Sequence, residues 1–99
     1  MPSRPLLTYA SAVILEAISN GLSYGFDVID ETGLPSGTVY PALRRMEAAV
    51  LIESGWDHQR SEKSGGPPRK HYRLTTGGQQ HLEILRRRFP LLSKAGRSK

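Results

Sequence analysis

The chain has 99 residues, 37% of them hydrophobic and 23% charged, which suits one small core and excludes a second folded unit, because domains cluster near about 100–150 residues. It has no cysteine, which excludes a disulfide framework, a thiolate zinc site and a cysteine nucleophile, and no apolar stretch approaches the roughly 20 residues of a membrane span. The net charge of +5 points to an anionic partner, and without a signal-peptide pattern we expect a soluble cytoplasmic protein.

Apolar residues at spacings of three and four predict a first amphipathic helix over 6–19, preceded by a disordered stretch over 1–5. The pair Asn20-Gly21 ends this helix because glycine tolerates a positive φ. Ser23 is then a candidate N-cap for a second, short helix over 23–32 that stops at Gly33.

A third helix carries an apolar stripe at four-, three- and four-residue steps: Val39, Leu43, Met46 and Val50. Pro41 is tolerated if it falls within the first helical turn, where a missing N–H has no partner, so we expect this helix to begin near Thr38. The second and third helices are joined by a tight turn at Leu34-Pro35. The pattern is that of a helix-turn-helix.

The periodicity then changes to about two and predicts two antiparallel strands, over 51–58 and 70–75, with a polar, partly basic loop between them. A last helix is expected from 76 to Pro90, which stops it, and 91–99 is expected to be a basic disordered tail. The predicted fold class is therefore mainly α with a small β-hairpin and a C-terminal helix.

The charge is unevenly divided along this chain. Residues 1–55 hold three basic and six acidic side chains, a net of −3, whereas residues 56–99 hold eleven basic and three acidic, a net of +8. A basic half of this kind is either a solvated surface or a contact for an anionic partner. The scaffold that carries the charge decides between these two interpretations.

Three segments resemble the PadR family of transcriptional regulators in the correct order, and the likeness covers about residues 10–82. These are 20–27, which is similar to the start of the family's second helix, 36–47, which is similar to its recognition helix, and 51–54 with 65–75, which is similar to its wing hairpin. The resemblance implies a winged helix-turn-helix over 6–75, a three-helix core with a two-stranded wing, followed by a dimerisation helix over 76–90. The implied function is sequence-specific binding of double-stranded DNA by a repressor dimer on a palindromic operator.

Candidate DNA-binding residues follow from that fold, because an α-helix fits the major groove and reads base edges near its N-terminus. At the start of the third helix these are Ser36, Gly37, Thr38, Tyr40 and Arg44. The wing offers basic side chains for phosphates or the minor groove: Arg60, Lys63, Arg69 and Lys70. Two alternatives remain open: Tyr40 packs on the second helix, and Arg45 and Glu47 form a solvated or ion-paired face.

Apolar residues of the first and last helices are candidates for a homodimer interface: Leu6, Ala10, Val13, Leu82, Leu85 and Phe89. Two departures from the family pattern bear on this. The C-terminal helical region is short, and Val50 stands where these regulators usually have a glycine. Because valine disfavours the left-handed conformation, we expect the third helix to run directly into the strand or to end differently.

Nothing in the sequence indicates an enzyme, a cofactor or a metal site. The three histidines, His58, His71 and His81, lack a second ligand at metal spacing, and no nucleophile motif is present. The sequence does not identify a small-molecule effector. Two other functions remain open: a winged-helix module that binds an acidic protein, and an RNA-binding module.

Overall fold

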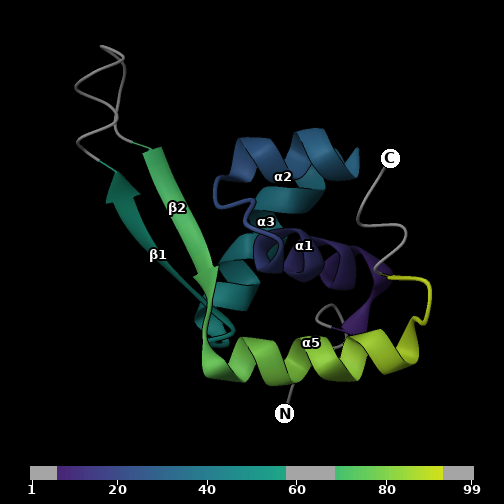
Figure 1. Cartoon of the computed structure of the whole chain (residues 1–99). Coiled ribbons are helices and arrows are strands. Elements are labelled where there is room, and N and C mark those ends of the chain that lie inside the picture. The colour runs from purple at the N-terminus through teal and green to yellow at the C-terminus, as the bar shows by residue number, and fades with distance from the viewer. Residues whose placement is uncertain (1–6, 58–68, 93–99) are drawn as a thin grey trace.

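Three helices, a β-hairpin and a further helix follow one another along the chain in a computed structural model that describes residues 7–57 and 69–92. Their bounds are α1 Tyr9–Ser19, α2 Gly25–Thr32, α3 Ser36–Ala48, β1 Ile52–Asp57, β2 Arg69–Leu74 and α5 Thr76–Arg88. In Figure 1, α1 lies at the centre, α2 and α3 lie on one side of it, α5 runs along the other, and the hairpin projects away from the helices. The predicted order of elements is confirmed.

Helix α1 is the centre of the core, with every residue from Ser11 to Ile18 buried. It begins at Tyr9, three residues later than predicted, because the Thr8 side chain caps it: the Ser11 N–H donates to Thr8 Oγ1 at 3.2 Å. Glu16 is buried with its neighbours and accepts a hydrogen bond from Arg86 Nε of α5 at 3.0 Å. This contact raises the pKa of Arg86 and joins α1 to α5.

Helix α2 begins at Gly25 rather than at the predicted Ser23, and Ser23 does not cap it. Instead the chain before α2 is extended and pairs with the edge of β2. The Tyr72 N–H donates to the Ser23 carbonyl at 2.7 Å, and Tyr24 forms a β-bridge with His71. The cap prediction is wrong because hydrogen bonding to a strand far along the chain competes with a local cap.

Helix α3 begins at Ser36, two residues before the predicted Thr38, and Pro41 lies within it. The missing N–H of Pro41 would have paired with the Gly37 carbonyl four residues earlier. Gly37 is exposed, and nothing lies within 4 Å of where its Cβ would be. The expectation of a later start is therefore wrong, because the helix accommodates Pro41 in its second turn.

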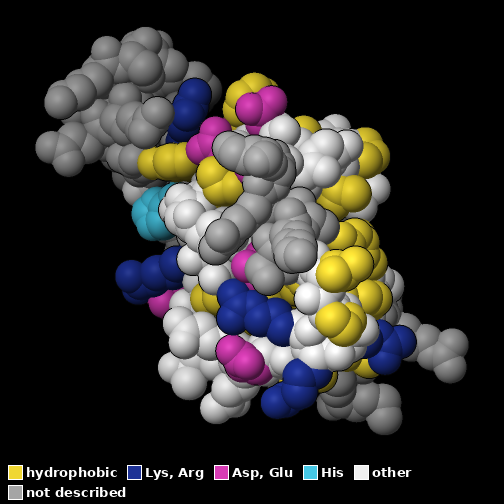
Figure 2. Space-filling view, turned by 45° about the vertical axis from the view of Figure 1, so that its right-hand side comes forward, with side chains coloured by type: hydrophobic (Ala, Val, Ile, Leu, Met, Phe, Trp, Pro, Cys, Tyr) yellow, Lys and Arg dark blue, Asp and Glu magenta, His cyan; other side chains and the backbone are white. Residues whose placement is uncertain are grey.

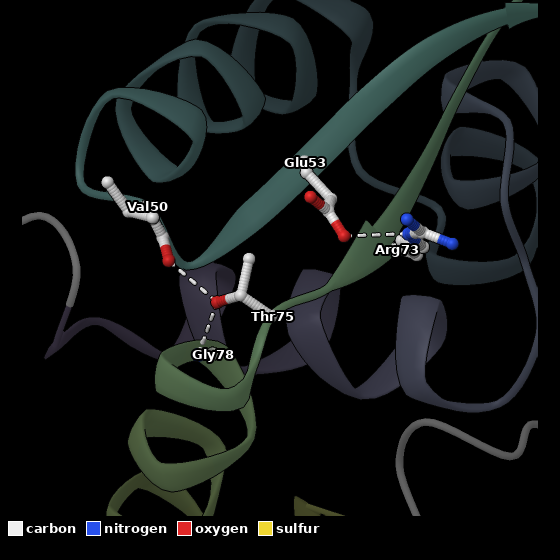
Figure 3. Close-up of polar contacts among 5 residues, drawn as sticks. All are labelled: Val50, Glu53, Arg73, Thr75 and Gly78. Atoms are coloured by element: carbon white, nitrogen blue, oxygen red, sulfur yellow. Dashed lines mark hydrogen bonds and ion pairs between the residues drawn. The ribbon is translucent and has the colours of Figure 1, made fainter.

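The end of α3 is a left-handed turn centred on Val50, which has a φ of +61°. The Val50 N–H donates to the Glu47 carbonyl at 3.0 Å and the Leu51 N–H to the Met46 carbonyl at 2.9 Å, the two bonds of a Schellman motif. Thr75 Oγ1 donates to the Val50 carbonyl at 2.6 Å (Figure 3). The expectation that valine avoids this conformation is wrong: these bonds hold it there, and its side chain is 67% exposed.

The hairpin is antiparallel, with a register that runs from the pair Ile52 and Leu74 to the pair Asp57 and Arg69. Both strands match the prediction to within one residue. Ile52 and Tyr72 are buried on the inner face. On the outer face Arg73 Nε donates to Glu53 Oε2 at 2.7 Å, as Figure 3 shows.

Helix α5 packs its first turn directly on the end of α3. Thr75 caps it by accepting from the Gly78 N–H at 2.9 Å, and a Cβ at Gly78 would overlap the Leu51 carbonyl. The helix ends at Arg88, as predicted from Pro90. Leu92 is buried in the core, so the boundary predicted for the tail, residue 91, is too early.

Candidate nucleic-acid interface

The start of α3 is exposed while its apolar stripe is fixed in the core. Ser36 and Gly37 are exposed, Thr38 is partly buried, and no side chain caps the N–H groups of this first turn. Val39, Leu43 and Met46 are buried on the opposite side, together with Ala42. The helix therefore presents a polar tip without a side-chain cap and the positive end of its dipole, an arrangement that favours a phosphate.

Tyr40 and Arg44 lie one helical turn apart and both reach solvent, Tyr40 with 40% of its surface. The Tyr40 ring also covers the start of α2, where a Cβ on Gly25 would be 2.6 Å from the ring. Tyr40 therefore packs on the second helix, as one alternative held, and also keeps part of its surface exposed to solvent. Glycine at position 25 is what lets the ring approach the backbone so closely.

The two predicted wing cations that the structure describes have different surroundings. Arg69 is exposed, and its guanidinium lies 5.7 Å from the centre of the Tyr24 ring. Lys70 is half-buried: its Nζ lies 3.5 Å from Glu47 Oε1 and within 6 Å of the Trp56 and Tyr72 ring centres, at 5.9 and 5.8 Å. Arg60 and Lys63 are outside the described residues.

Glu47 joins the recognition helix to the wing. The sequence left open only that Glu47 and Arg45 form a solvated or ion-paired face. Ser54 Oγ of β1 donates to Glu47 Oε2 at 2.5 Å, and Lys70 of β2 approaches the other carboxylate oxygen. The ion-paired alternative is confirmed for Glu47. Its carboxylate fixes the angle between α3 and the hairpin, and so the relative position of the two elements that would meet DNA.

A pocket of about 330 Å³ lies between the start of α2, the first turns of α3, and β2. It is lined by Tyr24, Gly25, Phe26, Tyr40, Arg69, Lys70 and Tyr72. Burial raises the pKa of the Tyr72 hydroxyl above its ordinary value, with Glu47 adding to the effect. Sequence reasoning found three of the seven residues and missed the pocket, because its lining comes from segments far apart in the chain.

Three of the six predicted dimerisation residues are buried inside this protomer. Val13, Leu82 and Leu85 are buried in the core that α1 and α5 share, while Ala10 and Phe89 are half-buried and Leu6 is outside the described residues. The first three are therefore unavailable to a partner, because they already pack within one chain. Large apolar side chains that do reach solvent near these helices are Tyr9, Ile84 and Leu91.

Side chains at the surface are mixed in character. Figure 2 shows hydrophobic side chains gathered along one side of the view, with basic and acidic side chains interspersed elsewhere. Among the described residues no cluster of three or more metal-ligating side chains is found. No helix in the described ranges combines the length and the hydropathy that crossing a membrane requires.

Comparison with known proteins identifies this arrangement. Residues 14–84 match the transcriptional regulator PadR-like family. A PadR family transcription regulator from hypervirulent Clostridium difficile is 32% identical, with a TM-score of 0.72 over 88% of this chain and 93% of that one. A PadR-like regulator from Bacillus cereus is 30% identical, with a TM-score of 0.69 over 93% and 91%.

A more distant structure has the same fold. It concerns Bordetella bronchiseptica BpsR, whose DNA binding is regulated by 6-hydroxynicotinic acid, and it is 20% identical with a TM-score of 0.70 over 95% of this chain and 67% of that one. No curated protein matches the chain. The helix-turn-helix with its exposed tip, the adjoining wing and the match over most of the sequence place this chain in the PadR-like family of DNA-binding transcriptional regulators, with the winged-helix fold of that family.

Proposed function

We propose that this protein is a cytoplasmic repressor that binds a specific double-stranded sequence as a homodimer, with the tip of α3 in the major groove and the hairpin on the neighbouring backbone. The observation that carries the proposal is that the tip and the wing cations open onto one shared surface, since Tyr40, Arg69 and Lys70 line the same pocket. A strand of DNA lying there would touch both elements at once.

The dimer is proposed from the exposed apolar side chains of α1 and the region around α5. Tyr9, Ile84 and Leu91 are 45%, 49% and 69% exposed, and Tyr9 packs edge-to-face on Phe89 at 5.3 Å between ring centres. Burying them between two copies would remove apolar area from water, which favours association. A twofold dimer on one face of B-DNA places its two recognition helices about 34 Å apart.

Selection of bound duplexes from a random pool tests the whole proposal. We expect an inverted repeat whose half-sites lie about one helical turn apart, and light scattering is expected to give the mass of two chains. A unique motif without symmetry would contradict the dimer. No binding to any duplex at about 50 mM salt would contradict DNA binding and favour the acidic-protein alternative, because phosphate contacts are strongest at low salt.

The role of α3 is tested with Arg44→Ala, with Arg87→Ala as the control, since Arg87 is an exposed arginine of α5. Arg44→Ala is expected to weaken operator binding by about 10- to 100-fold and to relax base preference at one position in each half-site. Equal losses on operator and random duplexes would remove Arg44 from base reading and make it a phosphate contact. The repressor role is tested by a reporter gene placed behind the selected operator, whose expression should fall when the protein is present.

A further inference from the structure

The pocket between α2, α3 and β2 combines features that suit an anionic group beside a weakly polar group that packs on aromatic rings. Its rim carries two cations, Arg69 and Lys70. Lys70 shares its charge with Glu47, and Arg69 lies over the Tyr24 ring. Arg69 therefore brings a positive charge to the pocket, and its stacking on Tyr24 holds the guanidinium in place.

Tyr72 supplies a neutral donor to the same pocket. Tyr72 is only 8% exposed, and its hydroxyl makes no hydrogen bond to any described residue. No fully buried side-chain polar atom in that part of the chain lacks a partner. Its hydroxyl must therefore reach open space, and the space that Tyr72 lines is the pocket. A tyrosine hydroxyl is protonated at neutral pH, so it can donate to an anion, and burial raises the pKa of Tyr72 further.

The start of α2 adds backbone donors at the wall. Its N-cap residue, Tyr24, makes no side-chain hydrogen bond to the helix, and Gly25 places bare backbone beside the Tyr40 ring. The N–H groups and positive dipole of this turn favour negative charge. The rings of Tyr24, Phe26 and Tyr40 surround these donors with apolar surface, and Phe26 is 67% exposed.

We propose that this pocket holds one phosphate of the DNA backbone, bound by Arg69, Lys70 and the Tyr72 hydroxyl, with the adjoining deoxyribose packed on Tyr24, Phe26 and Tyr40. The assignment rests on the proposed function and adds to it the place where the strand passes from the recognition helix to the wing. DNA is the source of phosphate that fits, because two of the three pocket walls, α3 and β2, belong to the elements proposed to contact DNA. Tyr72 and Arg69 fix the register of the protein along the duplex without reading a base.

The test pairs Tyr72→Phe with a scan of the selected operator in which one phosphate at a time is replaced by an uncharged methylphosphonate. Tyr72→Phe alone is expected to weaken binding by about 10-fold, because a hydrogen bond to a charged group is lost. A methylphosphonate at the one phosphate in each half-site that the pocket holds is expected to weaken binding by about the same factor. At that phosphate the two changes together should cost no more than one of them. The effect of Arg87→Ala, a change at an exposed side chain of α5, should be independent of the effect of every methylphosphonate.

The outcomes separate this proposal from the one on which it rests. If the losses of affinity caused by Tyr72→Phe and by the methylphosphonate multiply at every position, while the wild-type protein binds its operator, the pocket does not hold a phosphate. DNA binding would still stand in that case. If the wild-type protein binds no duplex, both proposals fail. Circular dichroism checks the fold of Tyr72→Phe. Should it unfold, the same cycle is run with Arg69→Gln, a change at an exposed side chain, with the same expected and refuting results.

The single tryptophan provides an independent reading. Trp56 is 57% exposed on β1, directly opposite Lys70. Strand passage through the pocket would bring DNA to this ring, so fluorescence excited at the tryptophan band should change on adding operator and should saturate with the binding curve. An unchanged Trp56 signal at saturating operator would contradict the path proposed for the strand.

Discussion

Val50→Gly is expected to stabilise the protein, because position 50 needs a left-handed backbone. Its φ of +61° is one that costs an L-residue about 1–2 kcal/mol, and a β-branched side chain is among the least suited to it. The Val50 side chain is 67% exposed, so its removal loses little packing. The hydrogen bonds of the turn use only the backbone of residue 50 and are kept.

Glycine also gives the unfolded chain more freedom, which opposes the gain by about 0.4–1 kcal/mol. The net stabilisation of Val50→Gly therefore lies between about 0 and 1.6 kcal/mol, and its midpoint of about 0.8 kcal/mol is equivalent to a rise in Tm of about 3–6 °C for a domain of this size. Thermal unfolding followed by circular dichroism at one fixed protein concentration measures it, since association would otherwise shift Tm.

Val50→Ala is the matched control. It shortens the side chain but keeps a Cβ, so the strain of the left-handed conformation remains and Tm should change by less than half as much. A Tm for Val50→Gly that is equal to or lower than that of the wild type would refute the reasoning. It would mean either that residue 50 is not left-handed in solution or that its side chain makes contacts that this structure does not contain.

Three further predictions concern packing, a buried ion pair and pH. Gly78→Ala should destabilise the protein by about 2–3 kcal/mol, because the new Cβ would overlap the Leu51 carbonyl. In the control Gly77→Ala the new Cβ would lie 3.6 Å from the Val50 carbonyl oxygen, so the change should be neutral or stabilise the protein by up to about 1 kcal/mol. Urea unfolding compares the two variants. Arg86→Ala should cost about 1–3 kcal/mol, because it leaves the Glu16 carboxylate buried without its partner, an effect reduced by the partial exposure of Arg86; Glu83→Gln, at the exposed partner of the same arginine, should change stability by less than about 0.5 kcal/mol. The pKa of Tyr72 is raised above 10.0 in the folded state, so its contribution to stability is full below about pH 10 and is lost as pH rises through the folded value. The urea midpoint should therefore fall further between pH 9 and pH 11 for the wild type than for Tyr72→Phe. Equal falls for the two proteins would contradict the raised pKa.

The elements that periodicity alone could predict are those whose residues are neighbours in sequence. The stripe of Val39, Leu43 and Met46 repeats at helical spacing and is buried as expected, and both strands of the hairpin were predicted to within one residue. Local caps were less predictable. Thr8 and Thr75 each cap a helix with their own hydroxyl, but Ser23, an equally good candidate by type, lies outside α2.

The failures share a cause, which is that a contact from elsewhere in the chain outweighs a local preference. Ser23 pairs with β2, whose position no pattern near residue 23 discloses. Val50 is held left-handed by the Schellman bonds and by Thr75. Leu82 and Leu85 form an apolar face, as their spacing indicates, but spacing does not tell which chain covers that face, and here α1 of the same chain does. The pocket is lined by three separate segments, so no single pattern in the sequence predicts it.

Thr75 connects these observations, because three elements meet at this one residue. Its hydroxyl donates to the Val50 carbonyl at the end of α3 and accepts from the Gly78 N–H at the start of α5, and its own N–H donates to the Leu51 carbonyl at 3.0 Å. Figure 3 shows the side chain between the two helices. With Gly78 packed against the same turn, α5 has little freedom to rotate relative to α3. In a dimer formed through α1 and α5, the angle between the two copies would then determine the relative orientation of the two recognition helices, because this short link is not a flexible hinge. The contacts between the copies would therefore set the half-site spacing that the protein accepts.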